Sequence, residues 1–295
     1  MIKYFIRILF AVVILLISNC LLAQDDLEEL LEKETEERTE QAIATFKSTR
    51  VINMHSIERM QQGDLDFRVS HRFGELNSGA YEFFGLDHSG SHLSLEYGIF
   101  NWLMLGAGRA TYQKTFDSFL KFSLIRQSSG EKNIPVSVSY YSGIAVNTLK
   151  FPESENDFFS SRLCYTHQIL AARKCSNRLS LQLSPTLVHR NLVKTADEKN
   201  DLIAAGVGGR FKLSNRTAVS IEYFYVHDKN NDPGVTYYDP LSVGFDIETG
   251  SHVFQLYFTN ATAIIEKGYI GETTGNWTDG DICFGFNISR VFTLK

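Results

Sequence analysis

The stretch Leu93-Ser94-Leu95-Glu96-Tyr97-Gly98-Ile99 has an apolar side chain at every second position, with small or polar residues between them. Successive side chains of a β-strand point to opposite faces, so this stretch predicts a strand with one apolar and one polar face. The same alternation recurs along the chain, for example at Val219–Tyr225 and Ile282–Ile288. We expect about twelve such strands between Asp64 and Phe292, with a less regular pattern near residues 103–112, 116–126 and 161–174.

The length of these strands favours a membrane protein. Most of them exceed the roughly 5–6 residues that are usual in soluble sheets, and they reach the roughly 9–11 residues that a tilted strand needs to cross a bilayer. Lipid cannot hydrogen-bond a free backbone, so spanning strands must close on one another. The sequence therefore predicts an all-β fold, a closed antiparallel up-and-down transmembrane β-barrel with apolar faces toward lipid and a polar lumen. A soluble sandwich or barrel, with the apolar faces inward, is the alternative.

The connections between the predicted strands alternate between short and long, apart from a short one at Gln113–Thr115. Outer-membrane barrels have short periplasmic turns and long outer loops, so the alternation predicts that both ends of the barrel chain lie on the periplasmic side. The short turns include Asn101-Trp102, Asn215-Arg216 and Thr249-Gly250, and the long loops include residues 77–90, 152–160, 194–200, 229–239 and 262–280.

The N-terminus reads as an export signal. Lys3 and Arg7 precede the one long apolar run of the chain, Ile8–Ile17, and Ala23 ends a segment typical of a signal peptide. Cys20 leaves open a lipid-anchor reading. We expect residues 1–23 to be removed and the mature chain to reach the cell outer membrane.

Charge divides the mature chain. Residues 24–45 carry nine acidic residues against Lys33 and Arg38, which predicts a short acidic helix or a disordered arm, with a docking arm for a periplasmic partner as the sharper hypothesis. The remainder is electrically balanced, which argues against binding nucleic acid. Residues 46–63 do not follow the alternation, and we expect them at the barrel rim or in the lumen, before the barrel at residues 64–295.

The polar faces carry charges of both signs, which we expect to line the lumen. Such a mixture leaves open whether the charges neutralise one another or form a selectivity surface for a polar solute. The lumen-lining candidates are Arg68, Arg72, Glu96, Lys121, Arg162, Arg190, Arg210, Glu222, Asp246 and Glu248.

Two further kinds of chemistry have candidate residues. Asp228, Asn230, Asp232 and Asp239 occupy places 1, 3, 5 and 12 of a calcium loop, but the glycine comes one place late and Asp replaces the usual last Glu, so a polar hairpin tip is the alternative. Ser70-His71 and His189-Arg190-Asn191 supply the residue types of a lipid hydrolase, although nothing fixes their mutual geometry. We expect no catalytic residues and no cofactor.

Five stretches of the chain carry a resemblance to a known family: Gly63–Gly74 (GDLDFRVSHRFG), Leu93–Gly98, Leu183–Val193, Gly244–Leu256 and Gly285–Phe292. They resemble a family of uncharacterised bacterial β-barrel proteins known as domain of unknown function 5777. The resemblance covers roughly Phe46 to the end and implies an outer-membrane barrel of Gram-negative cells, embedded in outer-membrane lipid and inserted by the barrel-assembly machinery. It implies no known activity, so no functional residue is transferred.

These observations together predict a narrow pore or uptake component for small solutes. A non-transporting barrel that serves as a structural or partner-docking protein is the first alternative. A lipid-modifying membrane enzyme is the second.

Overall fold

The computed structural model describes residues 39–150, 158–193, 195, 198–230, 232, 234–250 and 252–294. The predicted signal peptide and residues 24–38 of the acidic arm lie outside the described residues. The end of the arm, residues 39–45, contains no helix. Instead, the two-residue strand β1 (Glu40–Gln41) pairs with β6 (Ser128–Ser129).

The barrel wall is a closed antiparallel sheet, as the alternation predicted. Each wall strand pairs with the next one along the chain, and the last strand closes the barrel by pairing with the first, with Asn287 opposite Ser70. The wall strands are β2 (Asp64–Glu75), β3 (Ser89–Phe100), β4 (Leu103–Ala110), β5 (Phe116–Ile125), β7 (Ser137–Val146), β8 (Leu163–Lys174), β9 (Leu179–Arg190), β10 (Asp201–Lys212), β11 (Thr217–His227), β12 (Leu241–Thr249), β13 (His252–Thr259) and β14 (Cys283–Thr293).

The outer face of the wall is apolar and exposed. Leu95 and Phe245 leave about half of their surface uncovered, at 50% and 51%, while Glu96 and Asp246 beside them are buried at 0% and 4%. In a soluble sandwich the apolar face would be the buried one. The prediction of a barrel whose apolar side faces lipid is therefore confirmed.

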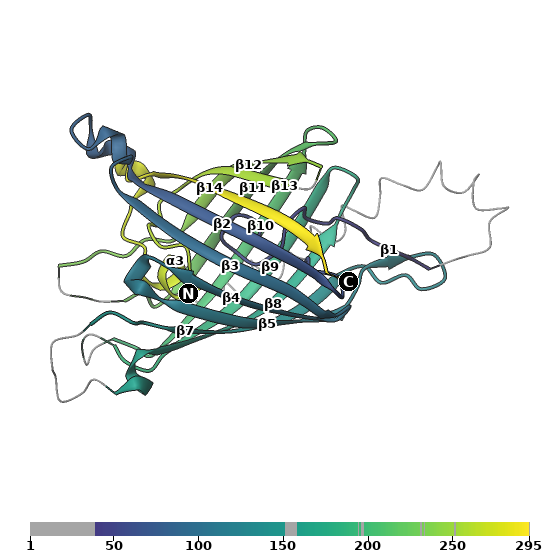
Figure 1. The fold of residues 1–295 in the computed structure, drawn as a ribbon, viewed down its shortest axis with the longest axis horizontal. Coiled ribbons are helices and arrows are strands. Elements are labelled where there is room, and N and C mark those ends of the chain that lie inside the picture. The colour runs from purple at the N-terminus through teal and green to yellow at the C-terminus, as the bar shows by residue number, and fades with distance from the viewer. Residues whose placement is uncertain are drawn as a thin grey trace.

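The two ends of the barrel differ in their loops (Figure 1). The C-terminus and β1 lie at one end, and α3 (Glu266–Gly271) lies toward the other, together with the short 3₁₀-helices η1 (Leu76–Ser78), η2 (Phe83–Gly85), η3 (Tyr112–Lys114), η4 (Phe159–Arg162) and η5 (Trp277–Asp279). We take the end with the longer loops as the outer one. In the described part of the chain, no helix is long and apolar enough to span a membrane.

The inner face of the wall is not polar throughout, so the expectation of a polar lumen is wrong over part of the barrel. Inward side chains of the strands from β4 to β11 form one buried apolar cluster with residues that precede the barrel and with α3. The wall contributes Met104, Phe119, Leu170, Val188 and Phe224, and the other segments contribute Phe46, Val51, Met54, Ile57, Tyr269 and Ile270.

Candidate functional site

Residues 46–58 lie inside the barrel as a tight hairpin, which we call the inner hairpin. Val51 N–H donates to the carbonyl of Met54 at 2.8 Å, Ser56 N–H donates to the carbonyl of Thr49 at 2.9 Å, and Arg50 and His55 form an isolated antiparallel bridge. Met54 and His55 are fully buried. A segment without the alternation of a wall strand thus fills the space that the wall encloses.

The tip of the inner hairpin is held by Glu222 on β11. Its carboxylate accepts hydrogen bonds from the backbone N–H groups of Ile52 at 3.1 Å, Asn53 at 3.0 Å and Met54 at 2.9 Å. The side-chain amide of Asn53 also donates to Glu222 at 2.6 Å. Three successive N–H groups that converge on one carboxylate form an anion-binding nest, so the wall anchors the tip through its backbone.

Three other predicted lumen charges hold the stem of the inner hairpin. Lys121 Nζ donates to the carbonyls of Ser56 at 3.0 Å and Glu58 at 2.9 Å. Arg68 Nη2 lies 2.9 Å from Thr49 Oγ1, and the same hydroxyl donates to Glu96 at 2.5 Å. These charges therefore bind the protein's own chain in the conformation described.

Neutral wall amides complete the anchorage, and the sequence reasoning missed them. Gln182 donates to the carbonyl of His55 at 2.7 Å, and Gln255 donates to the carbonyl of Val51 at the same distance. Asn287 donates to the carbonyl of Ile52 at 3.0 Å. The alternation places these amides on the inner face, but it does not distinguish an amide that binds the hairpin from the other uncharged polar residues of that face.

A second segment closes the barrel from the outer side. We call residues 260–273 the outer loop. Arg72 Nη1 donates to its carbonyls at Ala261, at 2.8 Å, and at Ala263. Glu266 of α3 lies 3.2 Å from Nε2 of His55 on the inner hairpin. The outer loop and the inner hairpin therefore meet inside the barrel.

Two of the remaining lumen candidates pair with each other on the inner face of the wall. Arg210 Nε lies 3.3 Å from Asp246, whose carboxylate also accepts from Ser220 at 2.8 Å. Both side chains are at least nine-tenths buried, and Gln255 links Asp246 to the carbonyl that it holds on the inner hairpin.

The last three lumen candidates lie toward the barrel ends. Arg190 pairs with Glu198 at 3.3 Å in an outer loop, and Glu248 pairs with Lys47 at 2.7 Å at the periplasmic end. Arg162 does not lie on the wall. It belongs to η4, before β8 begins, and donates to the carbonyl of Leu149 at 2.6 Å. Its predicted place in the lumen is therefore corrected to the outer rim.

The four calcium-loop candidates engage different partners. Lys199 donates to Asp228 at 2.5 Å, and this hydrogen bond lowers the pKa of Asp228. Asn230 accepts from Arg190 at 2.7 Å, Asp232 accepts from Tyr237 at 2.5 Å, and Asp239 accepts from the Val226 N–H at 2.9 Å. In the described part of the chain, no three His, Cys, Asp or Glu residues are grouped so as to hold a metal ion.

The residue types of a hydrolase are not brought together. Ser70 points into the barrel and is buried, whereas His71, next to it on β2, stacks on Phe286 with ring centroids 5.2 Å apart. His189 lies on β9, across the barrel from β2 in the strand order, and pairs with Asp201 at 2.6 Å. The geometry offers no nucleophile and base in contact among these candidates.

Comparisons with known proteins address the family. The model of a family described as "Membrane bound beta barrel domain (DUF5777)" matches residues 46–292. None of the curated proteins matches the sequence.

Among solved structures, the NanC porin has 8% sequence identity and a TM-score of 0.48, covering 78% of this chain and 99% of its own. The KdgM porin has 9% identity and a TM-score of 0.47, with the same coverage. An outer membrane channel from Pseudomonas putida F1 has 12% identity and a TM-score of 0.49, covering 80% of this chain and 98% of its own.

Proposed function

The chain belongs to the family of membrane-bound β-barrel domains DUF5777, and from this premise we propose that it is a gated outer-membrane pore for small polar solutes, closed by the inner hairpin in the conformation described. The observation that carries the proposal is the manner in which the hairpin is held. Its backbone is bound by polar side chains of the wall, such as Glu222, Lys121 and Gln255. Water can take the place of the hairpin as the hydrogen-bond partner of these side chains. A lumen with such a lining remains solvated when the hairpin leaves.

The apolar cluster accounts for a closed resting state. Val51 and Met54 of the hairpin pack on the apolar side of the wall, and their release exposes apolar surface at a cost of roughly 25 cal/mol per Å². Unassisted opening is therefore infrequent, and a force or a partner that offsets this cost makes it more frequent.

The segment that precedes the inner hairpin runs to the periplasmic end of the barrel, which suggests where an opening force acts. Ala42 N–H donates to the carbonyl of Gln127 at 2.8 Å, and Lys174 Nζ donates to the carbonyl of Ile43 at 3.0 Å. Both partners belong to the periplasmic end of the wall. We propose that residues 24–45 serve as the handle through which a periplasmic partner withdraws the hairpin.

A reversible lock tests the pore. A Cβ atom on Gly208 would lie 3.3 Å from Cγ2 of Val51, which brings a Val51→Cys/Gly208→Cys pair into the range of a disulfide once the flexible end of the Met54 side chain, the nearest group to that Cβ, shifts aside. The pair is placed in a background in which the described cysteines, Cys164, Cys175 and Cys283, are changed to Ala. Single-channel currents are recorded in planar bilayers before and after reduction, with the single variant Val51→Cys as the control.

We expect no current steps from the oxidised pair, steps after reduction, and no redox effect in the control. Equal currents in both redox states would mean that the hairpin does not gate the path. An absence of steps from the reduced pair and from the control would favour the non-transporting barrel.

A further inference from the structure

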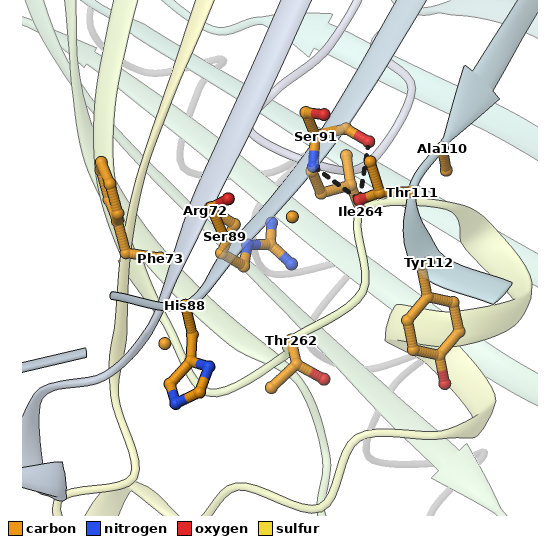
Figure 2. A pocket seen from close by; sticks show the side chains of 12 residues that line it. Arg72, Phe73, His88, Ser89, Ser91, Ala110, Thr111, Tyr112, Thr262 and Ile264 are labelled. Atoms are coloured by element: carbon orange, nitrogen blue, oxygen red, sulfur yellow. Dashed lines mark hydrogen bonds between the residues drawn. The ribbon is translucent and has the colours of Figure 1, made fainter. Parts of the chain in front are cut away.

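A crevice opens at the outer end of the barrel, between the outer loop and the ends of β2, β3 and β4. Its volume is about 340 Å³, which falls in the range of pockets that take small molecules. Ile264 and Thr262 of the outer loop form one side, and Arg72, Ser91 and Ala110 from the wall belong to the other. In Figure 2 the guanidinium of Arg72 lies in the middle of the lining side chains.

Arg72 is a buried cation without a carboxylate partner among the described residues. It is 1% exposed, and its acceptors are all uncharged: the carbonyls of Ala261 and Ala263, the Asn53 amide oxygen and, at 3.3 Å, the Tyr257 hydroxyl. The guanidinium also lies over the Tyr257 ring, 5.3 Å from its centroid. Its Nε has no hydrogen-bond partner in the described structure.

The other buried arginines of the wall are compensated differently. Arg68 lies 3.1 Å from Asp66, and Arg210 lies 3.3 Å from Asp246. A buried charge that lacks a counter-charge is costly, so the environment of Arg72 favours the arrival of an anion.

The remaining lining of the crevice is suited to such a ligand. The described residues around it include no Asp or Glu, and His88, the other basic side chain there, pairs with Glu82 at 3.0 Å. Thr262 of the outer loop supplies a hydroxyl group that can donate to a polar ligand.

We propose that this crevice is a binding site for a small organic anion, whose carboxylate or phosphate group pairs with Arg72 and whose neutral part lies against Thr262 and Ile264 of the outer loop. Guanidinium groups bind both kinds of anion through charge-assisted hydrogen bonds. The inference deepens the proposed function, since it names the chemical class of the solute at the outer mouth. Binding itself does not require that the barrel conduct.

Titration calorimetry of the full chain in detergent micelles tests the site with three probes of similar size: glucuronate, glucose 6-phosphate and neutral glucose. We expect at least one of the two anions to bind at least tenfold more tightly than glucose. Arg72→Gln should lower the affinity for that anion about ten- to hundredfold and leave glucose unaffected. A preference for glucuronate assigns the site to carboxylates, and a preference for glucose 6-phosphate assigns it to phosphates.

Two further variants separate binding from folding. Arg210→Gln removes the same charge from a paired position in the lumen and should leave anion affinity unchanged. Thr262→Trp fills the crevice while it leaves Arg72 in place, and should abolish binding, so it decides the question if Arg72→Gln does not fold. Heat-modifiable gel mobility reports folding of each variant.

Equal affinity for glucose and both anions would overturn the inference, as would an undiminished affinity in a folded Arg72→Gln variant or in Thr262→Trp. The same titration of the disulfide-locked Val51→Cys/Gly208→Cys protein separates this inference from the pore. Anion binding, together with an absence of current steps from the reduced pair, would support the site and remove the proposed function.

Discussion

The substitution Glu222→Gln should loosen the inner hairpin while it leaves the barrel wall intact. Glu222 accepts from three backbone N–H groups and from the side-chain amide of Asn53, and all of these donors belong to the hairpin tip. In glutamine one carboxylate oxygen becomes an NH₂ group that cannot accept a hydrogen bond. The side chain keeps its size, so the effect is confined to these bonds.

The magnitude follows from the number and kind of bonds. A hydrogen bond to a charged group contributes about 1.5–3 kcal/mol, and a neutral one contributes about 0.5–1.5 kcal/mol. The substitution removes the bond from the Asn53 amide and makes the remaining ones neutral. Because bonds within one network are not additive, we expect a net loss of about 3 kcal/mol, which shifts the open-to-closed ratio by about two orders of magnitude.

The assay is the open probability of single channels in planar bilayers at a fixed voltage. Glu248→Gln serves as the matched control, since Glu248 contacts the same hairpin through Lys47, at 2.7 Å, in a pair whose side chains are 26% and 30% exposed. Such a partly exposed pair contributes about 0–1 kcal/mol, so the control should change the ratio less than tenfold. An open probability in Glu222→Gln equal to that of the control would refute the role of the nest.

Two further predictions concern the wall. Val207→Arg, on the lipid face in the middle of β10, should cost about 2–4 kcal/mol of folding free energy in vesicles. Phe211→Arg, near the periplasmic end of the same face, should cost only about 0–1 kcal/mol. Equal urea midpoints of unfolding for the two variants would contradict the depth assigned to these residues in the membrane. Gly98→Ala should lower stability by about 1–3 kcal/mol, because the added Cβ would lie 1.9 Å from the carbonyl oxygen of Gln61, whereas Gly209→Ala meets nothing closer than 3.5 Å. The measurement is the temperature at which heating changes the gel mobility of the folded barrel. If this temperature is the same for both alanine variants as for the wild type, the close approach of Gly98 to Gln61 is refuted.

The irregular strands show what the alternation could and could not predict. Strands that face lipid on one side and small or polar groups on the other, such as β3 and β14, were clear in the sequence because their two faces differ. The patterns near residues 103–112, 116–126 and 161–174 were less regular because Met104, Phe119 and Leu170 point inward and pack in the apolar cluster of the lumen. A strand with apolar residues on both faces loses the period of two.

The site was predictable only in part for a related reason. The alternation placed Glu222 and Lys121 on the inner face, but it could not say what they bind. Asn53 and Glu222 are 169 positions apart in the chain, and their contact depends on closure of the whole barrel. The inner hairpin has no period of two, because its chain bends instead of running as an extended strand, with Arg50 and His55 forming only an isolated bridge.

The central claim is that residues 46–58 fill the lumen of the membrane-embedded protein. A Met54→Cys variant, in the background without the other described cysteines, tests it most directly, because Met54 is fully buried. In vesicles made permeable to the reagent from both sides, the account predicts that a charged thiol reagent labels Met54→Cys at least a hundredfold more slowly than an exposed control such as Arg178→Cys. Labelling of the two at the same rate would show that the lumen is not occupied by the hairpin.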